Sequence, residues 1–125
     1  MAHTLLIVDD ESAIRDVLVD FFSERGYVVT SAVSGAAALA AIREQTPTVV
    51  LLDLQLPGTL SGMDVLKAVA ATVPVIVITG NVDPESGRSV LAAGAFDYVS
   101  KPFDLMYLDT AVATAVTYGR KGRRG

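Results

Sequence analysis

The chain has 125 residues, of which 51% are hydrophobic, and this length matches a single domain with a core of ordinary size. It carries a formal net charge of -4, lacks cysteine and has His3 as its one histidine. Disulfides, cysteine nucleophiles and zinc sites are thereby excluded, so any bound metal is expected to be a hard ion with oxygen ligands.

The N-terminal residues do not predict a signal peptide. The apolar run at residues 5–8 is short and leads directly into the acidic triplet Asp9, Asp10 and Glu11. No other apolar run approaches the length of a membrane span. We therefore expect a soluble, cytoplasmic protein that makes no membrane contact.

Strand-like and helix-like stretches alternate along the chain, which is typical of an α/β domain. Strands are expected at residues 4–8, 27–32, 49–52, 75–79 and 97–99. Helices are expected to begin near Ser12, Gly35, Met63, Pro84 and Asp104. Because most of the strands are nearly continuous apolar runs, the predicted sheet is parallel and buried on both faces. Right-handed crossovers then give a doubly wound sheet, whose strand order the pattern leaves open.

The first and fourth helices carry the clearest signals. Apolar residues recur at core-facing spacing through the first helix: Ile14, Val17, Leu18, Phe21 and Phe22. Gly26 suits the C-terminal cap of that helix. The fourth helix is expected to have Asp83 as its N-cap, Pro84 at its first position and Glu85 in its first turn.

The basic residues are unevenly distributed. Four of the ten lie in the last six positions: Arg120, Lys121, Arg123 and Arg124. Residues 1–119 consequently hold 6 basic and 14 acidic side chains, a balance of -8, which argues against direct nucleic-acid binding. We expect the domain to span residues 1–119, and residues 120–125 to be a solvated basic tail or the start of a linker.

Polar residues follow four of the predicted strands at their carboxyl ends, where doubly wound sheets bind ligands. Asp9 and Asp10 follow the first strand and Asp53 follows the third; Thr79 ends the fourth, and Lys101 comes soon after the fifth. Singly, such residues are commonly helix caps or solvated side chains. Their joint position indicates one shallow functional site. Pro102 is expected to fix the turn after Lys101, with a cis peptide bond as one option.

Three crowded carboxylates raise one another's pKa unless a cation offsets their charge. Mg²⁺ suits this set because it binds one or two carboxylates together with waters and phosphate oxygens. One carboxylate could then attack phosphorus and form an acyl phosphate. The Lys101 ammonium could pair with one phosphoryl oxygen, and the Thr79 hydroxyl could donate to another.

The chain resembles the receiver domain of two-component response regulators from Leu5 to about Tyr118. The matching segments, in order, are IVDDE at 7–11, LDLQLP at 52–57, VITG at 77–80, GAFDY at 94–98 and KPF at 101–103. Each is weak alone, but their order and spacing are specific. The resemblance implies a five-stranded parallel sheet in the flavodoxin-like order 2-1-3-4-5, with five helices.

The resemblance also implies roles for the residues of the expected site. Asp53 is the phosphoacceptor and a metal ligand, Asp10 binds Mg²⁺ directly, and Asp9 binds it through water. The backbone carbonyl of Gln55 completes the protein's ligands, and Mn²⁺ is the alternative ion. Lys101 is the counter-charge of the phosphoryl group.

A second set of implied roles concerns signalling. Thr79 and Tyr98 form a switch pair, in which Thr79 is drawn to the phosphoryl group and Tyr98 turns inward behind it. Gln55 and Asn81 occupy positions that tune self-dephosphorylation. The conformational output passes through the fourth helix, the fifth strand and the fifth helix.

By the same resemblance, the phosphoryl donor is a histidine kinase or a phosphotransfer protein that docks over the first helix near Ile14, Val17 and Leu18. The domain would act on an output protein or on an output domain not present in this chain. Whether it works alone or within a longer regulator is left open. It would not be an enzyme beyond catalysing its own phosphorylation and dephosphorylation.

Two departures from the family pattern stand out. The loop at residues 58–63 is one residue longer than usual before its glycine. Residues 105–118 contain no lysine or arginine, so we expect core contacts and a moderately apolar docking patch there rather than a charged dimer seam. The residues expected on that surface are Leu108, Ala111, Val112, Ala115 and Val116.

Three other functions fit the sequence less well. A Mg²⁺-dependent aspartyl-phosphate phosphatase usually carries Asp-x-Asp, whereas Leu54 and Gln55 follow Asp53 here. A flavodoxin-like electron carrier would have a Ser/Thr/Gly-rich phosphate loop after the first strand, which this chain lacks. A receiver-like docking module that is never phosphorylated would not need the complete set of carboxylates, hydroxyl and lysine.

Overall fold

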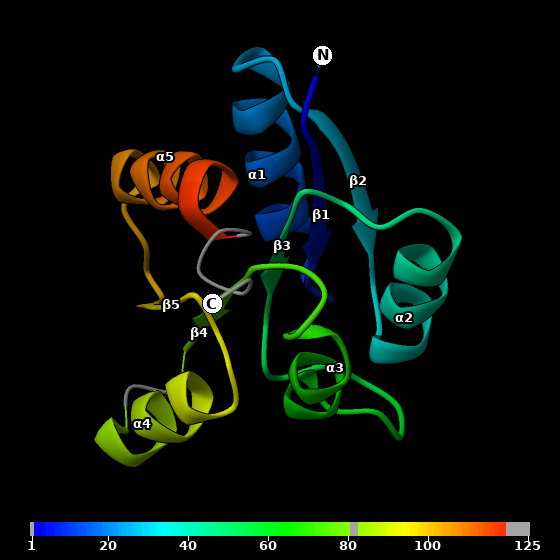
Figure 1. Ribbon diagram of the computed structural model, residues 1–125, viewed down its shortest axis with the longest axis vertical. Coiled ribbons are helices and arrows are strands. Elements are labelled where there is room, and N and C mark those ends of the chain that lie inside the picture. Colours follow the sequence, from blue (N-terminus) through cyan, green and yellow to red (C-terminus); the bar gives the residue numbers. More distant parts are fainter. Residues whose placement is uncertain (1, 81–82, 120–125) are drawn as a thin grey trace.

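The structure is a computed structural model that describes residues 2–80 and 83–119. In these residues five strands alternate with five α-helices (Figure 1). The strands are β1 (Thr4–Val8), β2 (Val28–Ala32), β3 (Val49–Leu52), β4 (Val75–Thr79) and β5 (Asp97–Ser100). The helices are α1 (Ser12–Glu24), α2 (Gly35–Glu44), α3 (Gly62–Val69), α4 (Pro84–Ala92) and α5 (Leu105–Thr114), and a π-helical turn, Ala115–Gly119, extends α5.

The predicted elements are confirmed, with small differences at their ends. β2 begins one residue later than expected, at Val28, and β5 extends one residue further, to Ser100. Helix α3 begins at Gly62 rather than Met63, and Asp104 is the N-cap of α5 rather than its first residue. Asn81 and the basic residues at 120–124 lie outside the described residues.

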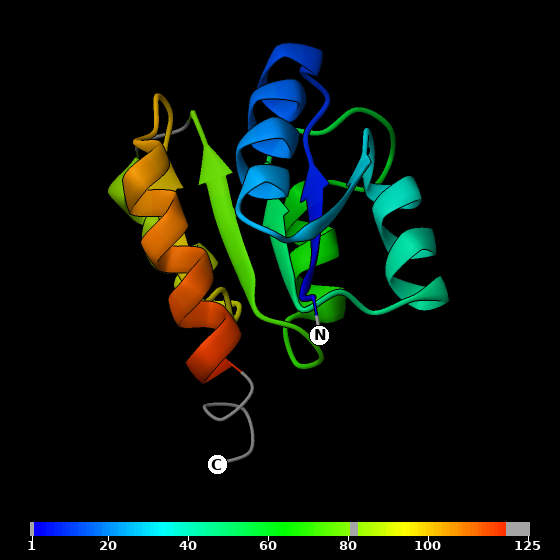
Figure 2. The same ribbon diagram turned by 90° about the horizontal axis from the view of Figure 1, so that it is seen from above.

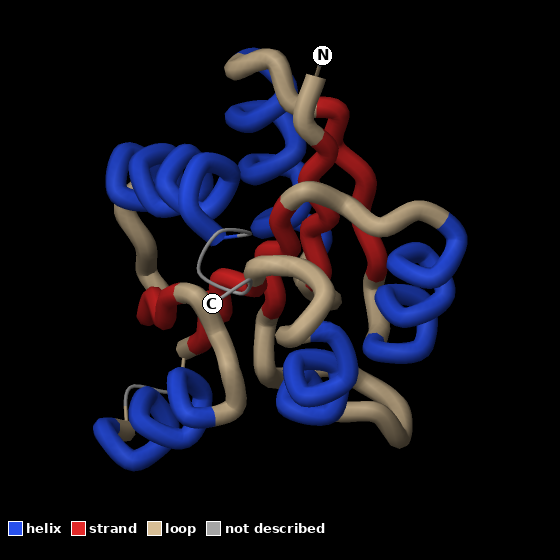
Figure 3. Tube along the Cα trace, viewed as in Figure 1, coloured by secondary structure: helices blue, strands red, loops and turns tan. Residues whose placement is uncertain are grey.

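All strand pairs are parallel, and the sheet order is β2-β1-β3-β4-β5. The sheet therefore has the order that the resemblance implied. Helices α1 and α5 cover one face, and α2, α3 and α4 cover the other, as Figures 1 and 2 show from two directions. Figure 3 shows the same arrangement, with the strands between the two groups of helices. Of the helices described, none has the length and apolar character needed to cross a bilayer.

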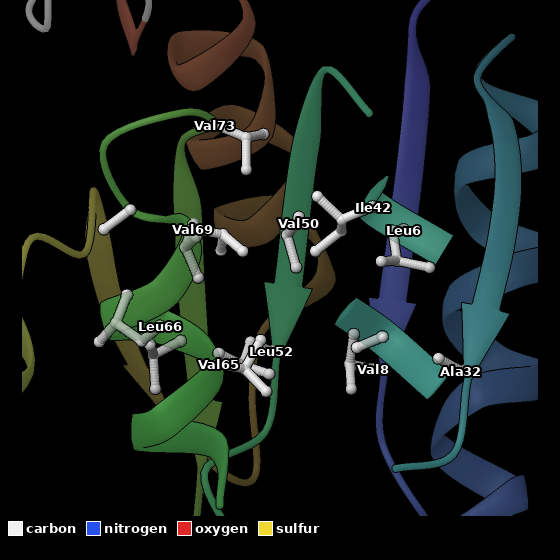
Figure 4. Packing of buried hydrophobic residues seen from close by; sticks show 14 of the residues in the cluster. Leu6, Val8, Ala32, Ile42, Val50, Leu52, Val65, Leu66, Val69 and Val73 are labelled. Atoms are coloured by element: carbon white, nitrogen blue, oxygen red, sulfur yellow. The ribbon is translucent and has the colours of Figure 1, made fainter. Parts of the chain in front are cut away.

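The sheet divides the core into two clusters. Alternate residues of β1, β3 and β4 face α2, α3 and α4, and the intervening residues face α1 and α5. Figure 4 shows Val50 and Leu52 of β3 between Val65 and Val69 of α3 and Ile42 of α2. The helices contribute unequally: α3 buries Val65, Leu66 and Val69, whereas Val90 alone is buried among the residues of α4.

One expected core residue is wrong. Leu18 and Phe22 are fully buried, and Ile14 and Phe21 pack against them, but Val17 is 48% exposed. Successive residues of an α-helix are about 100° apart, so Val17 falls on the flank of the stripe centred on Leu18. An apolar residue can therefore match the helical spacing of core residues and still lie outside the contact between α1 and the sheet.

The core contacts expected of the last helix are confirmed, but the residues named for its docking patch are not free to form one. Four of its five residues are buried in the cluster beneath α5, and Val116 packs against the same cluster. Since α5 covers a strongly apolar sheet face, these side chains are buried in the core or packed against it. They leave no apolar patch of their own for a partner.

Side-chain caps begin four of the five described helices. Ser34 caps α2, Ser61 caps α3, Asp83 caps α4 and Asp104 caps α5, each by accepting a hydrogen bond from a backbone N–H of the first turn. The exception is Glu11 at the N-cap of α1, for which the described part of the chain shows no capping hydrogen bond.

The long loop between β3 and α3 is held against the end of β3 by Gly62. The Gly62 N–H donates to the Leu54 carbonyl at 3.1 Å. A Cβ atom at position 62 would collide with the backbone of Asp53 and Leu54. The absence of a side chain at Gly62 therefore lets the start of α3 approach the backbone of Asp53, the residue that follows β3.

Replacing Gly62 by alanine should lower the free energy of unfolding by about 1–3 kcal/mol, because the backbone of Asp53 must move to admit the methyl group. Urea denaturation measures this. Gly80→Ala is the matched control, since a Cβ there meets nothing within 4 Å, and its effect should stay within about 1 kcal/mol. Equal stability of the two variants would show that the close packing of Gly62 against the backbone of Asp53 and Leu54 does not matter for folding.

Candidate functional site

Strand register brings Asp9 and Asp53 together. Val8 pairs with Leu52 at the ends of β1 and β3, and the Asp53 N–H donates to the Val8 carbonyl at 2.9 Å. The two aspartates therefore leave neighbouring strands at the same level. Both are buried, with 3% and 4% of their surface exposed.

Asp10 joins these two residues from the exposed side. One carboxylate oxygen from each of Asp9, Asp10 and Asp53 lies within 4.8 Å of the others. The donor set is entirely oxygen and anionic, which suits a hard divalent ion such as Mg²⁺ and gives a softer metal no sulfur or nitrogen ligand. The residues present therefore fit the ion that the sequence predicted.

Lys101 is the cation that the two buried carboxylates, Asp9 and Asp53, share. Its backbone N–H donates to the Thr79 carbonyl at 2.8 Å, which continues the β4–β5 pairing, and its peptide bond to Pro102 is cis. The Nζ atom donates to Asp9 Oδ2 at 3.0 Å and to Asp53 Oδ2 at 3.1 Å. The ammonium group thus spans the ends of β1 and β3 from a position after β5.

Each buried carboxylate is oriented in the same way. Oδ1 of Asp9 accepts the Glu11 N–H at 2.9 Å, and Oδ1 of Asp53 accepts the Gln55 N–H at 3.1 Å. Their Oδ2 atoms both accept from Lys101. The two side chains are consequently fixed before any ligand arrives, which favours rapid and specific binding.

The electrostatics of the site are not balanced. Burial raises the pKa of Asp53, and the opposing effects of the Gln55 N–H and of Lys101 do not fully offset it. Burial also works against the charge of Lys101, but the hydrogen bonds from its carboxylate partners dominate, so the pKa of Lys101 is raised. One ammonium therefore stabilises the cluster without neutralising it.

The two expected switch residues lie on neighbouring strands, Thr79 at the end of β4 and Tyr98 within β5. Thr79 is fully buried at the carboxyl end of β4. Tyr98 is partly buried, and its ring lies so close to Gly87 of α4 that a Cβ there would meet the ring at 3.2 Å. The structure thus links β5 to α4 through this ring, while the inward turn of Tyr98 stays a prediction.

Sequence reasoning missed two residues that contact the site. Glu11 Oε1 accepts from Lys101 Nζ at 3.1 Å, and Arg15 Nη1 donates to the Asp9 carbonyl at 2.8 Å. Glu11 could have been noticed as a glutamate at a helix start where shorter polar residues are preferred. The Arg15 contact has no comparable signal, because it depends on the path of the loop into α1.

The proposed docking surface on α1 needs one correction. Val17 is exposed and Ile14 is partly exposed, so a partner could reach both. Leu18 is buried against the sheet with 1% of its surface exposed and is excluded from that surface. The side of α1 that holds the helix to the core thus differs from the side that is free for contact.

Replacing Asp53 by asparagine should stabilise the protein at pH 7 when divalent ions are absent. Because the pKa of Asp53 is raised in the folded state, its ionised form is disfavoured there, and this penalty applies above the folded pKa. The advantage of the variant should therefore shrink as the pH falls toward 3.8, the ordinary value for the group. Urea denaturation in chelator at several pH values measures the difference. A variant less stable than the wild type at pH 7 would show that the Lys101 contact outweighs burial.

Comparison with known proteins agrees with this geometry. Residues 5–113 match the family model described as the response regulator receiver domain. The chain is 45% identical over 103 residues to the transcriptional regulatory protein KdpE of Mycobacterium tuberculosis strain H37Rv, covering 81% of this chain and 45% of that protein. It is 39% identical over 110 residues to the DNA-binding transcriptional regulator NtrC of Escherichia coli K12, covering 86% of this chain and 23% of that protein. The chain thus spans less than half the length of these relatives.

Solved structures show the same similarity. The receiver domain of NtrX from Brucella abortus superposes with a TM-score of 0.84 at 33% identity, over 90% of this chain and 98% of that one. A response regulator receiver domain protein (CheY-like) from Methanospirillum hungatei JF-1 gives a TM-score of 0.90 at 27% identity, over 98% of this chain and 99% of that one. This chain therefore belongs to the family of response regulator receiver domains.

Proposed function

We propose that the domain is a phosphorylation switch in which Asp53 accepts a phosphoryl group. One observation carries this proposal: the buried Asp53 carboxylate lies 3.1 Å from an ammonium group and within ligand distance of two further carboxylates. Glu11 shares the ammonium group but is 61% exposed, and Asp10 belongs to the cluster but is also exposed, so Asp53 combines both partners with burial. The pairing supplies both a nucleophile and the positive charge needed to hold its product.

In the proposed reaction, an Asp53 carboxylate oxygen attacks phosphorus and forms a new P–O bond. The bond between phosphorus and the donor breaks, and the leaving group, a histidine imidazole or acetate, takes the electron pair. Lys101 then pairs with a phosphoryl oxygen, and the Thr79 hydroxyl donates to another. The domain catalyses only this phosphorylation and the later dephosphorylation, in which water attacks phosphorus and releases inorganic phosphate and the Asp53 carboxylate.

The carboxylate cluster supports a role for Mg²⁺, with Mn²⁺ as the alternative. We assign Asp10 and Asp53 as direct ligands, Asp9 as a ligand through water, and the backbone carbonyl of Gln55 as a further ligand. A bound ion would neutralise charge shared by the carboxylates and the incoming phosphoryl group. Asp10 suits direct contact because it lies on the exposed side of the cluster.

The switch itself would be a shift between two loop arrangements. Phosphorylation adds about -1.5 to -2 charge units, which Thr79 and Lys101 contact better in one arrangement than in the other. Tyr98 would then move together with Thr79, and because its ring packs against Gly87, the change would pass from β5 to α4. By the family resemblance, α5 completes the output face. Gln55 and Asn81 would tune the lifetime of the phosphorylated state.

The partners follow from the family. The donor would be a histidine kinase or a phosphotransfer protein that contacts α1 near Ile14 and Val17. The names of KdpE and NtrC support an output in transcriptional regulation, through a partner or through a domain outside residues 1–119. We assign those residues to the receiver unit and residues 120–125 to a tail or linker. A cytoplasmic location stays a prediction.

Incubation with acetyl phosphate and Mg²⁺ should add one phosphoryl group to the wild-type protein, and Asp53→Ala should abolish the addition because the nucleophile is gone. Intact-mass spectrometry followed by peptide mapping measures both results. Asp20→Ala is the control, since Asp20 is an exposed carboxylate on α1. Uptake by Asp53→Ala, or none by the wild type, would refute the assignment and, in the second case, favour a docking module that is never phosphorylated.

Asp10→Asn should weaken Mg²⁺ binding on the order of tenfold, a loss that removal of even an outer-shell partner of a metal ligand can cause. Calorimetric titration of the two proteins with MgCl₂ measures the affinities. Asp16→Asn is the matched control, because it removes the same charge from an exposed position outside the cluster. Equal affinities for Asp10→Asn and wild type would remove Asp10 from the ligand set.

A further inference from the structure

The start of α1 differs from the start of every other described helix. The other four use serine or aspartate at the N-cap, and each of those side chains accepts a first-turn N–H. At the same position α1 has Glu11, which is not among the residues that favour this position. Helix α1, which begins just after Asp9 and Asp10, therefore lacks the stabilising side-chain cap that the other four have.

The Glu11 side chain makes a distant contact instead. Its Oε1 atom accepts a hydrogen bond at 3.1 Å from the Nζ atom of Lys101, a residue 90 positions away in the chain. An ammonium group has three N–H donors, and Asp9, Glu11 and Asp53 occupy all three in this structure. Lys101 therefore has no donor left for a phosphoryl oxygen unless one of these contacts breaks.

The three contacts are not equally easy to release. The side chains of Asp9 and Asp53 are both 4% exposed. While the phosphoryl donor approaches and Asp53 is still a carboxylate, either group would lose its partner without gaining water if Lys101 released it. The Glu11 side chain is 61% exposed and would be hydrated as soon as Lys101 let go. Of the three contacts of Lys101, the one with Glu11 consequently breaks at the lowest cost in free energy.

We propose that Glu11 is a positioning residue that holds Lys101 in the unphosphorylated arrangement and gives it up when Asp53 is phosphorylated. The inference rests on the function proposed above and deepens it. Glu11 does not touch the reacting atoms. It acts through Lys101, by competing with the phosphoryl group for one N–H donor, and so restrains phosphorylation of the resting protein.

Glu11→Asp tests the contact without removing the charge. The shorter side chain is a favoured N-cap and should turn toward the first N–H groups of α1, out of reach of Lys101. The rate of phosphorylation by acetyl phosphate should rise about two- to fivefold, the factor that corresponds to losing a weak ion pair. The urea midpoint of the variant should also rise, because α1 gains its cap.

Glu11→Gln removes the charge at constant length and should accelerate the reaction by a similar factor. Glu24→Gln is the matched control, since it makes the same change at the exposed far end of α1, and its rate should equal that of the wild type. If phosphorylation were faster in Glu11→Gln but not in Glu11→Asp, the cause would be repulsion between the Glu11 charge and the incoming phosphoryl donor, and the proposal would be overturned. Unchanged or slower reaction in both Glu11 variants would overturn it as well.

The outcome is distinguishable from failure of the function itself. If the wild type takes up no phosphoryl group from acetyl phosphate and Mg²⁺, the proposed function fails and this inference falls with it. If the wild type is phosphorylated on Asp53 and Glu11→Asp reacts at the same rate, the function stands and the role of Glu11 is refuted. Both results come from the same time course.

Discussion

The site depends on the repulsion of carboxylates held close together with too few cations to balance them. Asp9, Asp10 and Asp53 approach within ligand distance, Glu11 reaches the same ammonium group, and Lys101 is the cation bound among them. Burial makes this imbalance more severe, because ionised groups removed from water are stabilised only by their immediate partners. The cluster could therefore hold a divalent cation, whose charge would offset this repulsion.

The backbone makes this unfavourable arrangement possible. The β1–β3 register sets two aspartates side by side, the pairing of Lys101 with Thr79 brings the lysine in after β5, and Gly62 lets the following loop pack against Asp53. Each of these contacts is made by the main chain or depends on a missing side chain. Crowding these carboxylates destabilises the folded state, and burial of the large apolar clusters on the two faces of the sheet offsets that cost.

Much of the fold and the candidate site could be predicted from the sequence, because both depend on local pattern. Continuous apolar runs identified the strands, and polar residues after them identified Asp9, Asp10, Asp53 and Lys101. The errors concern long-range packing. Val17 has core-like spacing but lies on the flank of its helix. The apolar residues of α5 make the core contacts expected of them, and this packing leaves them unavailable for the docking patch that was also expected. The contact of Glu11 with Lys101 joins residues 90 positions apart, a relation that no local pattern encodes.

The single buried side chain of α4 has a consequence for the energy landscape of the domain. Segments with few buried apolar contacts open at lower free energy than the rest of a protein, and amide hydrogens exchange faster there. Helix α4 is held by Val90 and by the ring of Tyr98 against Gly87, whereas α3 inserts three aliphatic side chains into the same cluster. By this principle α4 should open at a lower free energy than α3, so its amide hydrogens should exchange faster than those of α3.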